Sequence, residues 1–143
     1  FIENPKKIKI KNTTSEKVKL PLHPDLRERG FREIKTNDEF YISDKIKKGK
    51  CYRLMHLFNF KDGKFLSKEI DKSINAILIH WLPLSKDLIK VNILMPDGTI
   101  KKGLGENSLK NLKVGDIIQF VRFGFVRFDG KKKDNYTFWY AHN

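Results

Sequence analysis

The sequence predicts an all-β protein, built as a small barrel or sandwich. Short segments with alternating apolar and polar residues recur about every 8 to 12 residues, and turn-forming residues separate them. Helix signals are weak, and 9 Gly and 5 Pro interrupt the chain. The 143 residues suit one ordinary domain or two very small ones. Closed barrels leave no exposed sheet edge, so two small barrels side by side fit the number of strands.

The first third of the chain contains strand-like segments of alternating character. Residues 6–12 alternate Ile with Lys, and residues 17–24 alternate until Pro21, where we expect the chain to leave its sheet. Residues 32–44 read as two strands on either side of Asn37-Asp38.

The middle third predicts a hairpin, a short helix and a buried strand. Residues 51–70 form the hairpin, with Asp62-Gly63 at its tip. Residues 66–78 have room for one or two helical turns, with Ser67 as N-cap and the face formed by Ile70, Ile74 and Ile77. Residues 75–83 are apolar enough for a buried strand that ends at a proline.

Two further hairpins are expected in the last third. Residues 89–106 turn at Pro96-Asp97-Gly98, and residues 115–142 turn at Asp129-Gly130. The Phe-, Val- and Ile-rich stretch 117–130 reads as strand.

The charge balance points to a polyanionic partner. Lys and Arg total 30 against 17 Asp and Glu, which gives a formal net charge of +13. We expect RNA or DNA first and an anionic membrane surface second. The alternative is that the charge has no specific partner and only keeps the protein soluble. No apolar run reaches the roughly 20 residues of a membrane helix, and no signal-peptide pattern is present. The chain starts at Phe1 without an initiator Met, so we expect it to be part of a longer polypeptide.

Sequence motifs for catalysis and metal binding are missing. Cys51 is the only cysteine, which excludes an internal disulfide and a multi-cysteine zinc site and fits a cytosolic setting. The chain has no phosphate-binding glycine motif, no metal-ligand spacing among its four histidines, and no paired acid and base. We therefore predict no catalytic residue, no metal ligand and no cofactor within this segment.

One of the basic clusters leads directly into a candidate base-binding segment. It comprises Lys45, Lys47, Lys48 and Lys50. Tyr52, Arg53 and His56 follow it, and such side chains stack on or bond to the bases of single-stranded RNA. The lysines would hold phosphates without reading sequence.

Gln119 and Arg122 form the sharpest candidate site. Uracil has two carbonyl acceptors flanking one N–H donor, and a Gln with an Arg can satisfy all three. In an ideal strand residues three apart point to opposite faces, so the chain must bend between them, and Gly124 makes that distortion plausible. The alternative is that Arg122 and Arg127 pair with acids across the sheet.

Several segments together resemble the C-terminal anticodon-binding region of class I glutamyl-tRNA synthetases of the archaeal and eukaryotic type, which glutaminyl-tRNA synthetase shares. They are NPKKIKIKN, LPLHPDLRERGFREI, FYIS, YRLMHLFNF, IHWLP, VNILMPDG and LKVGDIIQFVRFGFVRFD followed by FWYAHN. The resemblance covers the whole chain, 1–143. It implies two small antiparallel β-barrels with little helix, a distal one at roughly 19–75 and a proximal one at roughly 1–18 plus 76–143.

The resemblance also implies site residues. A Q-F-x-R segment in the relatives binds the central uracil, so Gln119 and Arg122 inherit that role. The relatives' R-L-R-N segment for flanking bases reads RLMH here, so Arg53 matches while Met55 and His56 depart from it, as suits a glutamate rather than a glutamine enzyme. The remaining matched or adjacent candidates are Arg32, Asp25, Lys45 and Lys50.

For the parent protein the resemblance implies an ATP-dependent glutamate–tRNA ligase of the cytoplasm. ATP and Mg would bind an upstream catalytic domain, and this segment would bind tRNA(Glu) without activating glutamate. In the archaeal branch tRNA(Gln) is a second partner, and the residues leave that choice open. The alternatives are a free-standing RNA-binding barrel protein and a protein–protein docking module.

Overall fold

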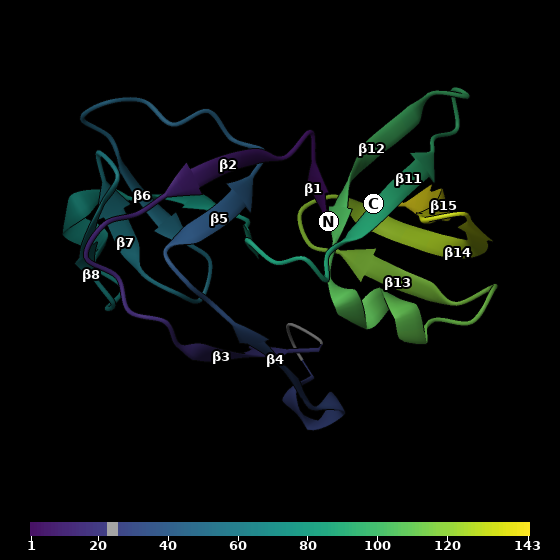
Figure 1. Cartoon of the computed structure of the whole chain (residues 1–143), viewed down its shortest axis with the longest axis horizontal. Coiled ribbons are helices and arrows are strands. Elements are labelled where there is room, and N and C mark those ends of the chain that lie inside the picture. Colours follow the sequence, from purple (N-terminus) through teal and green to yellow (C-terminus); the bar gives the residue numbers. More distant parts are fainter. Residues whose placement is uncertain (23–25) are drawn as a thin grey trace. The chain divides into compact units, whose positions relative to one another are not determined.

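The computed structural model describes residues 1–22 and 26–143, which divide into two compact units (Figure 1). Unit 1 comprises Phe1–Lys6 and Ser85–Asn143, and unit 2 comprises Lys7–Leu84. The fold is all-β, as predicted, and the helices among the described residues are short 3-10 turns: η1 (Arg27–Arg29), η2 (Lys72–Ile74) and η3 (Asn107–Asn111). The boundaries expected from the resemblance, at 18/19 and 75/76, differ from these divisions.

Unit 1 is a six-stranded sheet. Its strands, in sheet order, are β1 (Ile2–Glu3), β12 (Ile100–Gly105), β11 (Ile89–Leu94), β15 (Asn135–His142), β14 (Gly124–Lys132) and β13 (Ile117–Phe120). All neighbours are antiparallel except β11 and β15, which are parallel. The parallel pair joins strands that lie far apart in sequence, so the long connection between them supplies β12, η3, β13 and β14.

The core of unit 1 follows from the alternation of its strands. Ile93, Phe128 and Phe138 are opposite one another across β11, β15 and β14, and all three are buried. The two edges of the sheet approach each other, since Phe1 beside β1 stacks on Phe120 of β13 with 5.3 Å between ring centroids. The sheet is therefore curled around its apolar face.

Unit 2 contains two connected sheets and a ribbon. One sheet has the order β10 (Leu82–Pro83), β5 (Glu39–Ile42) and β2 (Lys6–Lys9); the other has the order β8 (Lys64–Ser67), β7 (Asn59–Lys61), β6 (Cys51–Leu54) and β9 (Ile77–Ile79). Lys11, just beyond β2, bridges to Lys64 of β8 and joins the two sheets. At the other end, the chain passes from β9 to β10 through His80 and Trp81. This double connection gives a barrel-like unit around Phe40, Leu54 and Phe60.

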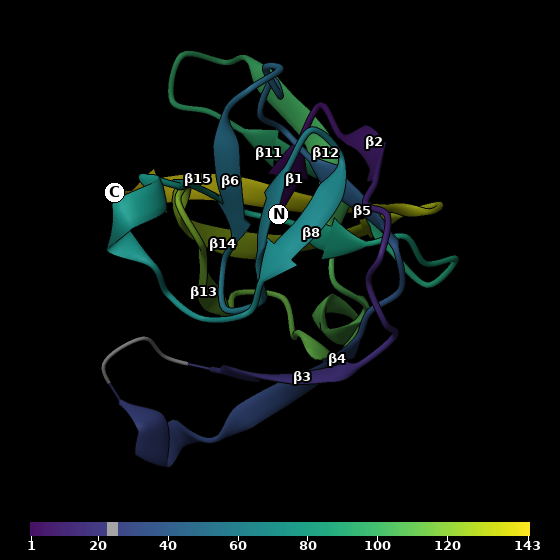
Figure 2. The same ribbon diagram turned by 90° about the vertical axis from the view of Figure 1, so that its left-hand side faces the viewer.

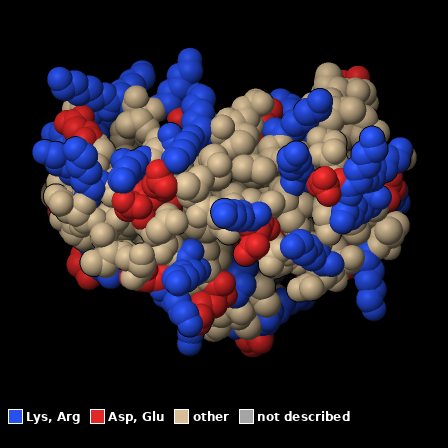
Figure 3. Space-filling model, viewed as in Figure 1, with Lys and Arg blue, Asp and Glu red and all other residues tan. Residues whose placement is uncertain are grey.

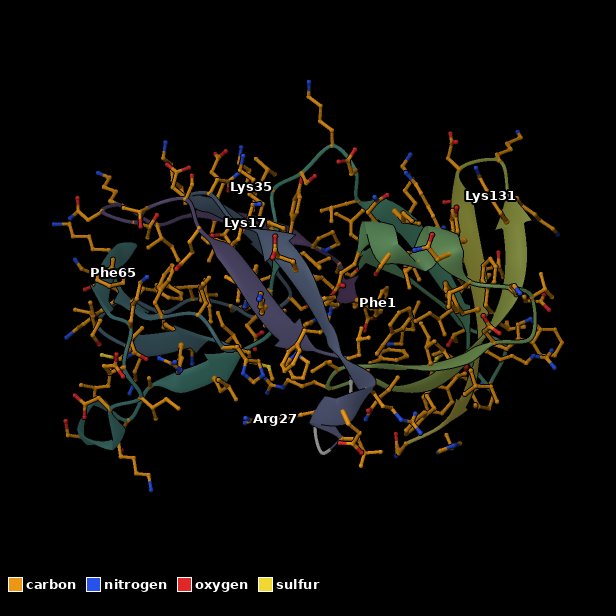
Figure 4. All side chains as sticks on the ribbon, turned by 90° about the horizontal axis from the view of Figure 1, so that it is seen from below. Phe1, Lys17, Arg27, Lys35, Phe65 and Lys131 are labelled. Atoms are coloured by element: carbon orange, nitrogen blue, oxygen red, sulfur yellow. The ribbon has the colours of Figure 1, made fainter. Side chains whose placement is uncertain are left out.

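The ribbon of unit 2 pairs β3 (Lys17–Pro21) with β4 (Phe31–Lys35) and extends away from β6 and β8 (Figure 2). Lys17 and Lys35 are cross-strand partners at one end of the ribbon (Figure 4). At that end the backbone N–H of Thr36 donates to the Glu16 carbonyl at 2.8 Å.

Two of the predicted turns are confirmed. β7 and β8 are connected by Asp62-Gly63, whose φ angles of 49° and 73° are both positive, as a two-residue hairpin of the primed type requires. β11 and β12 are connected through Pro96-Asp97-Gly98, where the Gly98 N–H donates to the Met95 carbonyl at 3.0 Å.

Three other predictions of local structure are wrong. Asp129-Gly130 is a bulge and not a turn, because β14 continues paired to β15 as far as Lys132. The expected strand 75–83 is divided, because Ile77–Ile79 pairs with β6 whereas Leu82–Pro83 pairs with β5.

The helix expected at 66–78 is shorter than predicted. Its only helical turn is η2, which is capped by Asp71 and not by Ser67, and its proposed apolar face is exposed at Ile70 and Ile77. Across the described part of the chain, no helix has the length and apolar character to cross a membrane.

Candidate nucleic-acid interface

The predicted bend between Gln119 and Arg122 is present. Gln119 is exposed on β13 opposite Phe125, and the strand ends at the next residue. The Phe123 N–H then donates to the Phe120 carbonyl at 2.9 Å, closing a tight turn. Arg122, at the third position of that turn, is exposed and has φ of 61°.

The neighbours of Arg122 hold this turn in place. The Phe123 ring lies edge-on to Phe1 and to Tyr140, at 5.2 Å and 5.9 Å between centroids. Gly124 has φ of 134°, and a Cβ there would lie 2.8 Å from the His142 carbonyl oxygen. Glycine is therefore required two residues after Arg122. The Phe123 ring between them is packed against Phe1 and Tyr140, and the Arg122 side chain is exposed.

A turn of the same design occurs in unit 2, between β6 and β7. The Leu57 N–H donates to the Leu54 carbonyl at 2.9 Å, and His56 at the third position has φ of 61°. His56 is exposed while Leu57 and Phe58 are buried. A positive φ is uncommon for residues other than Gly, although Asn, Asp and His adopt it more often than the rest, and it costs on the order of 1–3 kcal/mol. Two predicted site residues thus occupy strained turn positions, one in each unit.

Arg53 makes hydrogen bonds within its own unit. Its Nη1 lies 3.0 Å from Oδ1 of Asn59, 3.0 Å from the Lys68 carbonyl oxygen and 3.3 Å from that of Glu69. Asn59 is buried, and its Nδ2 donates to Ser67 Oγ at 2.9 Å and to the Glu69 carbonyl at 2.7 Å. Arg53 and Asn59 therefore fix the segment after β8, a link that the sequence does not signal because Asn59 belongs to no local motif.

Tyr52 is not available to stack on a base, contrary to expectation. Its ring is buried against Phe60 at 5.6 Å between centroids, and its hydroxyl oxygen accepts from the Lys47 N–H at 2.9 Å. The Gly49 N–H donates to Asp62 Oδ1 at 2.7 Å. These bonds order the basic loop between β5 and β6, where Lys45 and Lys50 are exposed.

The remaining candidates lie on the ribbon or outside the described residues. Arg32 on β4 donates through Nη1 to the Pro21 carbonyl at 2.8 Å and is half-buried. Asp25 lies outside the described residues. Arg127 does not pair with an acid across the sheet. Its Nη2 is 3.8 Å from Asp129 on the same strand, and its guanidinium lies over the Trp139 ring at 5.2 Å.

Lys and Arg side chains cover much of the visible surface of both units (Figure 3). The ion pairs among the described residues join exposed Lys or Arg side chains to exposed or half-buried carboxylates, as for Lys7 with Glu39 at 2.9 Å, where the hydrogen bond to the carboxylate raises the pKa of the lysine. Within residues 1–22 and 26–143, no group of three or more His, Cys, Asp or Glu is placed to hold a metal ion. The exposed side chains described above can form hydrogen bonds, stack on bases and attract phosphates.

Small β-barrel units with exposed cations and strained, solvent-facing turns define a module of the nucleic-acid-binding class. The particular family follows from comparison with known proteins. The chain belongs to the anticodon-binding domain family of class I tRNA synthetases (E and Q), whose models match residues 1–81 and 78–129.

Curated relatives of the chain include archaeal proteins named glutamate–tRNA ligase. The protein of Methanocaldococcus jannaschii is 43% identical over 99% of this chain, and that of Pyrococcus furiosus is 34% identical over 99%. The chain spans 28% of the first relative and 27% of the second. It therefore matches one part of those longer proteins.

Proposed function

We propose that the chain is the anticodon-reading region of a glutamate–tRNA ligase, and that Gln119 and Arg122 bind the central uracil of the anticodon. The turn at Arg122 is the observation that carries this proposal. It takes the chain out of straight strand geometry within three residues of Gln119, at an exposed position with a left-handed φ. Observed backbone strain of this kind is a pointer to function.

The chemistry of the two side chains suits uracil. The Gln119 amide supplies one acceptor and one donor, and the Arg122 guanidinium supplies a planar fork of donors. Uracil presents an N–H between two carbonyl oxygens, whereas cytosine presents an amino group and a ring nitrogen in place of one carbonyl and the N–H. Cytosine would oppose donor to donor, so we expect it to bind more weakly.

We propose supporting roles for the other candidates. Arg53 holds the segment after β8 through its bonds to Asn59 and the carbonyls of 68 and 69, and His56 faces a flanking base from the β6–β7 turn. Arg32 contributes near the anticodon from the ribbon, and Asp25, outside the described residues, contributes there as well. Lys45 and Lys50 hold phosphates, which positions the RNA without reading it.

In the intact protein, unit 1 would be the proximal barrel and unit 2 the distal one. The upstream catalytic domain of the same chain would use ATP and Mg to attach glutamate to tRNA(Glu), in the cytoplasm, and tRNA(Gln) shares the central uracil. Binding energy at the anticodon would orient the distant acceptor end.

The test is binding of the chain to a glutamate anticodon stem-loop, compared with the same loop carrying cytosine at its centre. We expect the change to weaken binding by roughly 1–3 kcal/mol, the range for a good bidentate base contact. Arg122→Ala should abolish that difference, whereas Lys45→Ala should weaken both loops alike and lower the log–log salt slope by about 0.7.

Two outcomes would contradict the proposal. Equal binding of both loops, with only salt affecting affinity, would mean a basic surface without base reading. Tighter binding to an acidic peptide than to RNA at matched salt would instead indicate a docking module for proteins.

A further inference from the structure

The outer face of β13, β14 and β15 carries exposed apolar side chains, one of them a Trp, that folding does not explain. Ile117, Arg127 and Trp139 are opposite one another in the register, and Ile117 and Trp139 are 60% and 46% exposed. The inner face of β14 and β15 holds the buried Val126, Phe128 and Phe138. Outward positions of a sheet with one buried face are normally polar, so an exposed Trp there calls for a partner.

The row next to it contains the proposed base reader. Gln119, Phe125 and His142 are opposite one another, and the Phe125 and His142 rings stack at 4.6 Å between centroids. Gln119 and Ile117 are two residues apart on β13, so they share a face and lie about 7 Å from each other along the strand. The Arg–Trp pair thus adjoins Gln119 on the same surface.

We infer that Arg127 and Trp139 form a stacking site for a base that adjoins, in the RNA, the uracil read by Gln119. This inference rests on the proposed function. The Arg127 guanidinium already lies over the Trp139 ring at 5.2 Å, so a flat, cation-bearing surface is preformed. Bases stack both on aromatic rings and on guanidinium planes.

The charges of this face favour RNA as the occupant. Lys90 and Lys102 occupy outward positions on β11 and β12 in the same sheet. The Asp129 carboxylate is exposed and lies 3.8 Å from Arg127. The Arg127 guanidinium lies over the Trp139 ring although this carboxylate is close to it. Phosphates would be held by the lysines around a central stacking surface.

The fluorescence of the chain offers a direct test, because its two Trp residues differ in exposure. Trp81 is 4% exposed, and its Nε1 donates to the Met55 carbonyl at 2.9 Å. Titration with the anticodon stem-loop should therefore quench the emission of Trp139 and protect it from acrylamide. Trp139→Phe should remove this signal and still bind RNA, since Phe also stacks.

Affinity should follow stacking and not base identity. Trp139→Ala should weaken binding about 5- to 150-fold, equally for loops with uracil or cytosine at the centre. Arg122→Ala should instead remove the difference in affinity between those loops. The two variants therefore test the stacking site and the uracil reader separately. Ile100→Ser, exposed at the β12 end of the same row of side chains, is the matched control and should leave RNA affinity unchanged.

Abasic nucleotides locate the stacked base. An abasic site at one of the two neighbours of the central nucleotide should weaken binding of the wild-type chain by the same factor as Trp139→Ala. The Trp139→Ala variant should bind the abasic loop no more weakly than it binds the intact loop. The inference is overturned if neither neighbour shows this coupling or if saturating RNA leaves Trp139 emission unchanged. It is also overturned if Ile100→Ser weakens RNA binding as much as Trp139→Ala, because apolar area along this row and not stacking on Trp139 would then account for the affinity.

Discussion

Replacing Arg122 by Gly or by Ala should change the stability of the folded chain differently but remove the preference for uracil in both cases, because the backbone at Arg122 is strained. Arg122 has φ of 61° in a turn closed by a 2.9 Å hydrogen bond. A left-handed φ costs a residue with a Cβ about 1–2 kcal/mol, and glycine adopts it freely. Glycine loses about 0.5–1 kcal/mol more conformational entropy than alanine on folding. Arg122→Gly should therefore be more stable than Arg122→Ala by about 0.5–1 kcal/mol.

The comparison of these two variants isolates the backbone. Both lack the Arg side chain and all of its contacts, so only the conformational preference of residue 122 differs between them. Urea unfolding, followed by tryptophan fluorescence and by circular dichroism, gives the difference in unfolding free energy. In the stem-loop assay both variants should bind uracil and cytosine loops equally, even though one is the more stable.

Two results would refute this reasoning. Equal stability of the two variants, or a less stable glycine variant, would mean that residue 122 is not held in a left-handed conformation. Retention of the preference for uracil in Arg122→Gly would mean that the strained side chain is not the base reader.

Three other perturbations have defined outcomes. Gly103→Ala should destabilise unit 1 by about 1–3 kcal/mol or more in thermal unfolding, because a Cβ there would lie 2.1 Å from the Ile2 carbonyl oxygen. Asn59→Ala should cost about 1–3 kcal/mol by leaving buried partners unbonded, and should speed amide exchange in residues 67–69. Hydrogen bonds from the Thr99 hydroxyl and then its N–H lower the pKa of Asp97, so this carboxylate stabilises the fold above its unfolded pKa, and that contribution is lost as pH falls through the lower folded pKa.

Each of these has a control and a contradicting result. Gly98→Ala places its Cβ in open space and meets only the strain of a φ of 82°, about 1–2 kcal/mol, so a Gly103→Ala variant that is more stable than Gly98→Ala would contradict the steric explanation. Asn59→Asp keeps the acceptor for Arg53 but loses the amide donor, and an exchange rate equal to wild type would remove Asn59 as the organiser of that segment. An NMR titration of Asp97 with a midpoint in the ordinary Asp range, about 3.9, would contradict the hydrogen-bonded turn.

Local chemistry made some of the fold predictable. Asp62-Gly63 and Pro96-Asp97-Gly98 form their turns because Asp and Gly tolerate positive φ and proline presets its own. The turn at Arg122 has no such composition, so local residue types indicate strand across 117–130, and the bend is expected only because Gln119 and Arg122 must reach one base. What holds that turn is packing by residues distant in sequence, Phe1 and Tyr140 against Phe123.

The candidate site shows the same division. Charge, turn spacing and the Q-F-x-R segment pointed to Gln119 and Arg122 and to a bend between them. The burial of Tyr52 against Phe60 and the bonding of Arg53 to Asn59 depend on strand pairing, which joins residues through register and not through adjacency.

By itself, the sequence determined an all-β chain with a strong positive charge, its hairpin turns at Asp62-Gly63 and Pro96-Asp97-Gly98, and its resemblance to an anticodon-binding region. Tertiary structure alone decided that Asp129-Gly130 is a bulge, that 75–83 is split between two sheets, and that Trp139 lies exposed beneath Arg127. The physical reason is that turn propensity and charge are properties of neighbouring residues, whereas register and exposure are set by which distant strands pair and which face of the sheet closes over the core.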